Sequence, residues 1–126
     1  MRLLLDTHVL LWWLADDPAL PPRTISVIGA ERDVYVSAAS AWEIAIKRAL
    51  GKLEAPDDLA GAVTACDFRQ LPVGFEHAAL AGALPRHHDD PFDRMLVAQA
   101  RLEGLTIVTG DARFARYEVP VLAAAP

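Results

Sequence analysis

Three aspartates stand near the start of the segment HHDDPFDRMLVAQARLEG, residues 87–104, whose remaining pattern is that of a buried helix. Asp90 is predicted to cap this helix, with Pro91 as its first residue and Asp93 in its first turn, as in a capping box. That interpretation explains both acids, because a first-turn carboxylate also interacts favourably with the helix dipole. The segment therefore indicates further chemistry only if acids from other parts of the chain reach the same place.

The elements that must position these acids follow from the hydrophobic pattern. Short apolar runs that end in a polar residue are typical of buried parallel strands, and helical patterns lie between them. The strands are predicted at residues 2–6, 33–38, 68–73 and 105–111, with a last one that includes Val119 and Val121. The helices are predicted at residues 7–15, 22–31, 40–53, 57–66, 75–83 and 91–103. This alternation predicts an α/β fold with a parallel sheet covered on both faces.

Polar residues follow the predicted strands at the edge where such sheets bind ligands, beyond the carboxyl ends of the strands. Asp6 and Ser37 end two strands, and Asp111 follows a third. Glu43 lies in the first turns of the helix after the second strand, and Asp93 opens the helix before the third. We therefore expect four acids, Asp6, Glu43, Asp93 and Asp111, to converge from four segments of the chain.

Four carboxylates in one place require positive charge among them. Within about 6 Å of each other they repel by roughly 3 kcal/mol per pair at an effective dielectric constant near 20. Mg²⁺ or Mn²⁺ fits best, because these ions prefer carboxylate and water oxygens, and they support hydrolysis of phosphate esters. His8, His87 and His88 could add ligands, although solvation is the simpler interpretation of loop histidines beside Arg86.

Glu43 also has two purely structural interpretations. Ser40 and Glu43 have the S-x-x-E spacing of a capping box. Glu43 and Lys47 have the i,i+4 spacing of a helical ion pair. A cap or an ion pair would account for this acid without a metal ion.

The composition limits the partners and the compartment. With 53% hydrophobic residues and no repeat, residues 1–126 are expected to form one globular domain. Asp6 and His8 interrupt the apolar N-terminus well short of the roughly 20 residues that a membrane span needs, so no membrane association is expected. Cys66 is the single cysteine, which fits the reducing cytoplasm. The net charge of −5 excludes nucleic-acid binding through a broad basic face, so such contacts must be local or use metal ions or a second subunit.

Four motifs, taken in order, resemble those of the PIN-domain nucleases, and specifically the VapC-type toxins of toxin–antitoxin pairs. They are LLLDTHVLLWWL, SAASAWEIAIKRALGKL, HHDDPFDRMLVAQA and TIVTGDARF. The resemblance implies a three-layer α/β/α sandwich with a central, mainly parallel sheet. It also implies an endoribonuclease that depends on Mg²⁺ or Mn²⁺, is inhibited by a VapB-type antitoxin and is usually a homodimer.

The same resemblance assigns the metal to four acids, Asp6, Glu43, Asp93 and Asp111, with Asp90 as a possible auxiliary. We expect Asp6 and Asp93 to bind the principal ion directly, and Glu43 and Asp111 to act through water or to bind a second ion. Hydrolysis by water would leave a 5′-phosphate and a 3′-hydroxyl on the RNA.

Other side chains around the acids are assigned supporting roles. Thr7 and Ser37 are expected to hydrogen-bond to the carboxylates or to metal-bound water, or else to cap helices. Arg94 and Arg113 could contact substrate phosphates, or else form ion pairs with Asp90 or Asp111. Each of these residues therefore keeps two interpretations.

Trp12 and Trp13 indicate a separate surface. Adjacent helical side chains point about 100° apart, so both rings are buried only if the helix is covered widely. We expect core packing for at least one ring, and an antitoxin or dimer surface near the pair, because tryptophan is enriched at interface hot spots.

Other functional classes share parts of this pattern. A receiver-like signalling domain also binds magnesium at strand ends, but it needs a lysine on the same edge, and Lys47 and Lys52 both belong to the predicted helix 40–53 or its end. A small-molecule phosphatase would share the chemistry, but no DxDxT-like motif follows the first strand. A noncatalytic PIN-like RNA-binding protein is disfavoured by the intact acids.

Overall fold

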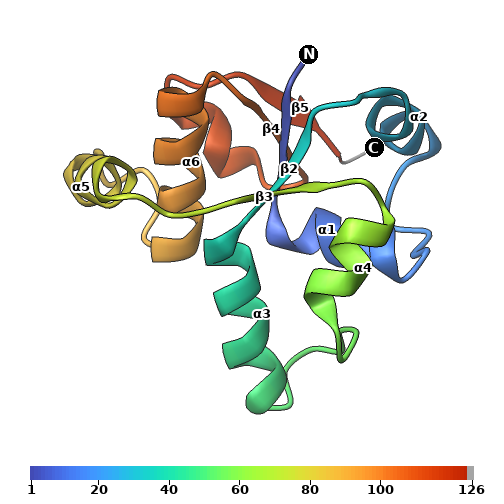
Figure 1. Ribbon diagram of the computed structural model, residues 1–126. Helices are drawn as coiled ribbons and strands as arrows, with labels where there is room; N and C mark the ends of the chain where they lie inside the picture. Colours follow the sequence, from blue (N-terminus) through green and yellow to red (C-terminus); the bar gives the residue numbers. More distant parts are fainter. Residues whose placement is uncertain (125–126) are drawn as a thin grey trace.

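The computed structural model describes residues 1–124, which fold around a parallel β-sheet (Figure 1). The strand order is β3-β2-β1-β4-β5, and all of these neighbours pair in parallel. The strands are β1 (Leu3–Leu5), β2 (Val34–Ser37), β3 (Arg69–Leu71), β4 (Thr106–Thr109) and β5 (Val121–Ala123). Because β1 is central, the residue that follows it, Asp6, stands in the middle of the edge formed by the carboxyl ends of the strands.

Helices pack on both faces of the sheet, which confirms the predicted three-layer α/β/α architecture. The three leucines of β1 are all fully buried, and their side chains alternate between two cores. Leu3 and Leu5 pack in one core with Ile28, whereas Leu4 packs in the other with Leu96. The helices are α1 (Thr7–Leu14), α2 (Pro22–Ala30), α3 (Ala38–Ala49), α4 (Leu59–Ala65), α5 (Phe75–Ala83) and α6 (Pro91–Glu103), and a short 3₁₀ helix, η1, spans Ala112–Arg116.

The boundaries of α3 differ from the prediction of residues 40–53. The helix begins earlier, at Ala38, because the Ser37 hydroxyl caps it by accepting a hydrogen bond from the amide of Ala39 at 3.0 Å. Ser40 is therefore not the cap, and its predicted capping box with Glu43 is wrong. The helix ends before Gly51, whose φ of 70° is left-handed, as expected of a glycine that stops a helix.

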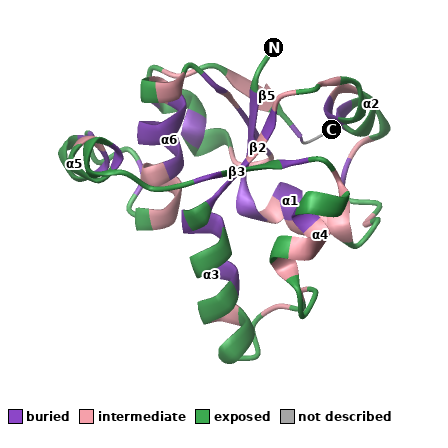
Figure 2. Cartoon of the chain, viewed as in Figure 1, coloured by how far each residue is buried: buried purple, intermediate pink, exposed green. Residues whose placement is uncertain are grey.

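The edges of the fold are more exposed than its centre. Figure 2 shows exposed residues over much of α5 and α3, whereas β1, most of β2 and β4, and the middle of α6 are buried. Strand β3 pairs only with β2, as expected of an edge strand followed by Pro72. Among residues 1–124, no helix is long and apolar enough to cross a membrane.

Candidate metal centre

The four predicted acids come together where β1, β2 and β4 end. Asp6 caps α1, Glu43 lies in the second turn of α3, Asp93 lies in the first turn of α6, and Asp111 caps η1. The N-cap position of Asp90 in α6 is also as predicted, since its Oδ1 accepts from the amides of Phe92 and Asp93. A cleft of about 310 Å³ is lined by Asp6, Glu43, Asp90 and Asp93, with Thr7, His8, Lys47 and Lys52 among the other lining residues.

Asp93 shows most clearly how crowded these charges are. Burial, followed by the negative charges of Asp6, Asp90, Glu43 and Asp111, raises the pKa of Asp93 from 3.8 to about 8. Its side chain is 13% exposed. A buried carboxyl group whose pKa is raised by neighbouring carboxylates is typical of a site that binds a cation.

Asp6 is held by hydrogen bonds to both of its carboxylate oxygens. Its Oδ1 accepts from the amide of Thr7 at 2.7 Å, and its Oδ2 accepts from the hydroxyl of Thr109 at 2.6 Å. The Nδ1 of His8 lies 3.1 Å from the same Oδ2, and the Nε2 of His8 accepts from the amide of Gly110 at 3.0 Å. Burial of the His8 ring lowers its pKa, but the hydrogen bond and charge of Asp6 outweigh this effect and raise the pKa overall.

Thr109 is a site residue that the sequence interpretation missed. Its hydroxyl donates to Asp6 and accepts from the amide of Asp111 at 3.0 Å, so one buried side chain connects two of the acids. The available signal was its position, because Thr109 ends the strand beside β1 on the same edge of the sheet. The sequence analysis gave a supporting role to Ser37, a hydroxyl at the end of a buried strand, but none to Thr109.

Glu43 accepts from two partners inside the cleft. The Thr7 hydroxyl donates to its Oε1 at 2.6 Å, and the Lys47 ammonium donates to its Oε2 at 2.6 Å. The predicted ion pair with Lys47 is therefore present, and this hydrogen bond raises the pKa of Lys47. Thr7 contacts a carboxylate, whereas Ser37 serves as the cap of α3.

His88 is buried, so its predicted solvation is wrong. Its side chain is 3% exposed, and its Nε2 lies 2.6 Å from Oδ2 of Asp93 and 3.5 Å from Oδ2 of Asp111. These three residues offer ligand atoms that all lie within 4.8 Å of one another. His87, in contrast, is exposed and packs edge-on against the ring of Tyr117.

The two predicted arginines are both engaged within the chain. The Arg94 guanidinium donates to the carbonyl oxygens of Ala81, Leu84, Pro85 and His88 at 2.9–3.4 Å. Arg94 therefore holds the segment before α6 in place. Among the described residues it forms no ion pair with Asp90 or Asp111, and its guanidinium is directed at carbonyl oxygens of the chain and not at a site for phosphate.

Arg113 forms the ion pair that was its alternative interpretation. Its guanidinium is 2.8 Å from Oδ2 of Asp111 and also contacts Oδ1. This hydrogen bonding lowers the pKa of Asp111 from 3.8 to about 2. Asp111 is therefore an anion under ordinary conditions, whereas Asp93 is not.

Trp12 and Trp13 are both half-buried. The Trp12 ring packs edge-on against His8 with 4.8 Å between the ring centroids, and the Trp13 ring packs against Phe68 at 5.5 Å. The two rings also line a pocket of about 250 Å³, together with Asp16, Asp17, Leu20 and Ile25. Both residues thus contribute to packing and still reach the surface.

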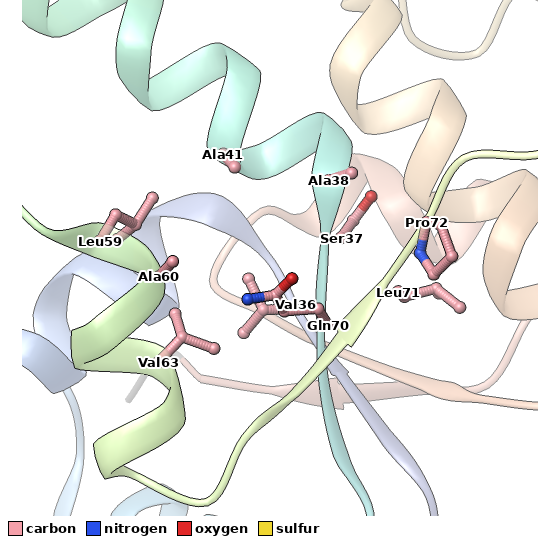
Figure 3. Close-up of a pocket in the computed structure, with 10 residues that line it drawn as sticks. All are labelled: Val36, Ser37, Ala38, Ala41, Leu59, Ala60, Val63, Gln70, Leu71 and Pro72. Atoms are coloured by element: carbon pink, nitrogen blue, oxygen red, sulfur yellow. The ribbon is translucent and has the colours of Figure 1, made fainter.

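A larger pocket of about 440 Å³ lies apart from the acids, between α3, α4 and the outer strands. Figure 3 shows Leu59, Ala60 and Val63 on α4 facing it from one side, with Leu71 and Pro72 on the other. None of its lining residues is ionisable. The smaller acidic cleft is therefore the better candidate for chemistry, despite its size.

Comparisons with known proteins show the family of the chain. A family model described as PIN domain matches residues 3–120. The chain is 32% identical over 125 residues to Ribonuclease VapC22 of Mycobacterium tuberculosis, and the match covers 93% of this chain and 92% of that protein.

Two solved structures share the fold. FitAcB from Neisseria gonorrhoeae matches with a TM-score of 0.72 and 21% identity over 98% of each chain. DNA-bound VapBC from Salmonella typhimurium matches with a TM-score of 0.71 and 16% identity over 99% of each chain. At these identities the two structures support the fold alone.

Proposed function

Since the chain belongs to the PIN domain family, as its four motifs indicate, we propose that it is the ribonuclease toxin of a VapBC-type pair. In this proposal residues 1–126 form a single nuclease domain that hydrolyses RNA phosphodiester bonds with the help of Mg²⁺ or Mn²⁺. The observation that carries the proposal is that Asp6, Glu43 and Asp93 line one cleft, with Asp111 next to Asp93, and that the pKa of Asp93 is raised to about 8.

The balance of charge within the cleft supports one divalent ion. Lys47 neutralises Glu43, and Arg113 neutralises Asp111, each through a direct ion pair. Asp6, Asp90 and Asp93 have no such arginine or lysine partner among the described residues, and Asp90 is already engaged with the amides at the start of α6, which leaves Asp6 and Asp93. Two uncompensated carboxylates match the charge of one Mg²⁺ or Mn²⁺, and carboxylate oxygens are the ligands these ions prefer.

Each residue of the cleft then has a specific task. Asp6 and Asp93 would hold the ion, and Thr109 and His8 orient the Asp6 carboxylate through the contacts described above. Glu43, fixed by Thr7 and Lys47, would orient water near the ion. The ion, when bound, activates water and offsets negative charge on a phosphoryl oxygen.

The RNA contacts in this proposal are few and local. Lys52 lines the cleft, and Arg113, paired with Asp111, has a side chain that is 55% exposed. Both can approach a phosphate without the broad basic surface that a net charge of −5 excludes. Hydrolysis by water leaves a 5′-phosphate and a 3′-hydroxyl, so a 2′,3′-cyclic phosphate would contradict the mechanism.

The partners follow from the same family. The matching structures include VapBC and FitAB complexes, and we propose by analogy a VapB-type antitoxin and a homodimer in the cytoplasm. We place a partner surface at Trp12 and Trp13, since both rings reach the surface beside a pocket. If the Trp12→Ala and Trp13→Ala variants fold and keep full antitoxin affinity and assembly, this placement is wrong.

RNA cleavage tests the activity directly. The purified protein is incubated with total RNA and Mg²⁺ or Mn²⁺, with EDTA and the Asp93→Asn variant as controls. Discrete fragments that need the ion and disappear with the variant would support the proposal, and sequencing of their ends would identify the target. If RNA stays intact and calorimetry detects no ion binding, the noncatalytic alternative is correct.

A further inference from the structure

We propose that His88 is a positioning residue of the metal centre. In this proposal its Nε2–H, fixed in one tautomer by the amide of Asp90, holds the carboxylates of Asp93 and Asp111 in the arrangement that receives the ion. The inference rests on the proposed metal-dependent function and adds to it a residue outside the four acids.

The segment before α6 holds the His88 ring firmly in place. The His88 amide donates to the Tyr117 hydroxyl at 3.1 Å, and that hydroxyl donates to the carbonyl of Pro85 at 2.9 Å. Arg94 donates to the carbonyls of Pro85 and His88 at 3.1 and 3.4 Å. The imidazole packs edge-on against Phe114, with 6.0 Å between the ring centroids. These contacts fix the backbone of His88 and pack one edge of its ring, while the Nε2 of the ring lies beside the acids.

The hydrogen bonding of the ring determines which nitrogen carries the proton. The Asp90 amide donates to His88 Nδ1 at 3.3 Å, so Nδ1 must present its lone pair. The proton of the neutral ring is then on Nε2. A histidine that binds a metal through Nε2 instead donates from Nδ1 to an acceptor, which is the opposite tautomer. The local hydrogen bonding therefore favours a donor over a direct ligand.

The position of Nε2 indicates what this proton does. Nε2 lies 2.6 Å from Asp93 and 3.5 Å from Asp111, yet no single contact reaches the geometry of a directed hydrogen bond among the described residues. In this proposal the Nε2 proton serves both carboxyl groups, since its nitrogen is within 3.5 Å of each. A donor shared in this way holds the two groups together and fixes which oxygens remain for the ion.

Loss of the His88 Nε2 donor is expected to weaken ion binding. Without the Nε2 donor, no side chain between Asp93 and Asp111 holds them in place, and the Asp93 side chain is free to turn away. Removal of such an outer hydrogen bond typically weakens metal binding by about 10- to 100-fold. We expect a loss in this range for Mg²⁺ and for Mn²⁺ alike, because no ligand atom is removed.

Two substitutions at position 88 distinguish the role of Nδ1 as an acceptor from the role of Nε2 as a donor. The amide group of His88→Asn falls where Nδ1 was, so this variant keeps an acceptor for the Asp90 amide but lacks the Nε2 donor. The amide of His88→Gln reaches the Nε2 position and can still donate. His87→Gln is the control at an exposed neighbour, and circular dichroism confirms that each variant is folded.

Calorimetry with Mg²⁺ and with Mn²⁺ gives the ion affinity of each protein without any RNA. We expect His88→Asn to lose about tenfold or more and His88→Gln to stay within about threefold, with His87→Gln unchanged. Wild-type affinity in His88→Asn, or a His88→Gln variant as weak as His88→Asn, would overturn the proposal. If the wild-type protein binds no ion, the proposed function itself fails, which is a distinct result.

Nitrogen-15 NMR of the imidazole supplies a second readout. In the neutral ring we expect the proton on Nε2 of His88 both in EDTA and in Mg²⁺. A proton on Nδ1 would overturn the proposal. Loss of the Nε2 proton when Mg²⁺ is added would also overturn it, because His88 would then be a ligand of the ion.

Discussion

Replacing Asp93 with Asn is expected to stabilise the metal-free protein while abolishing its response to metal. In the folded protein, burial and four neighbouring carboxylates raise the pKa of Asp93 from 3.8 to about 8. At pH 7 the unfolded chain ionises this group freely, whereas the folded protein must keep it protonated. The difference of about three pH units corresponds to roughly 4 kcal/mol at 1.36 kcal/mol per unit. Asn is neutral in both states and removes this penalty.

The sign of the pH dependence follows from the raised pKa. Stability of the metal-free wild type is greatest below pH 4 as far as this group is concerned, and it is lost as the pH rises toward 8. The Asp93→Asn variant lacks this loss. The difference between the two proteins should therefore grow from pH 4 to 8 and then level off.

Thermal unfolding in EDTA at pH 5, 7 and 9 measures this difference, and the same scans with Mg²⁺ measure the response to the ion. A gain of up to about 4 kcal/mol at pH 7 corresponds to a rise in Tm of more than about 10 °C for a chain of this size. Asp89→Asn, which removes an exposed charge beside the cleft, is the matched control. If Asp93→Asn is no more stable than wild type in EDTA at pH 7, the four acids do not repel one another as the structure implies.

Three other substitutions test separate contacts. Arg94→Ala should lower the free energy of unfolding, measured by urea titration, by roughly 2–4 kcal/mol, because it leaves carbonyl oxygens without donors. A change below about 0.5 kcal/mol would contradict the role given to this arginine. Thr109→Val keeps the side-chain shape but removes the donor to Asp6, and calorimetry should show about tenfold weaker ion binding, with Thr109→Ser near wild type. Arg113→Ala should raise the pKa of Asp111 from about 2 toward its ordinary value, as carbon-13 NMR of the carboxyl group can show, and an unmoved pKa would mean that the ion pair is not formed in solution.

The fold and the four acids could be predicted because both depend on patterns that are local in sequence. Leucine-rich runs separated by helical segments predicted the sheet, and the rule for carboxyl ends placed Asp6 and Asp111 on one edge. Glu43 and Asp93 followed from their positions in the first turns of adjacent helices. None of these steps needed the identity of a contact between distant side chains.

The supporting residues could not be predicted in the same way. The burial of His88 depends on Arg94 and Tyr117, which approach it from α6 and from beyond η1. The sequence between α5 and α6 has no periodic pattern from which such contacts could be predicted. This is why solvation was the simpler interpretation of His88. The cap of α3 was misplaced for a related reason, because Ser37 and Ser40 both precede helical sequence and only the end of β2 decides between them.

In the proposed function, the same distribution of charge lets an acidic protein act on RNA. Glu43 and Asp111 are each paired with a cationic side chain of the protein, so Asp6 and Asp93 are the acids of the site that remain for an ion. In this proposal an entering ion is attracted by Asp6 and displaces the proton of Asp93, which then ionises and binds it. With the ion bound, the cleft would attract phosphate instead of repelling it. For RNA binding, the charge at this edge of the sheet would then matter more than the net charge of the whole chain.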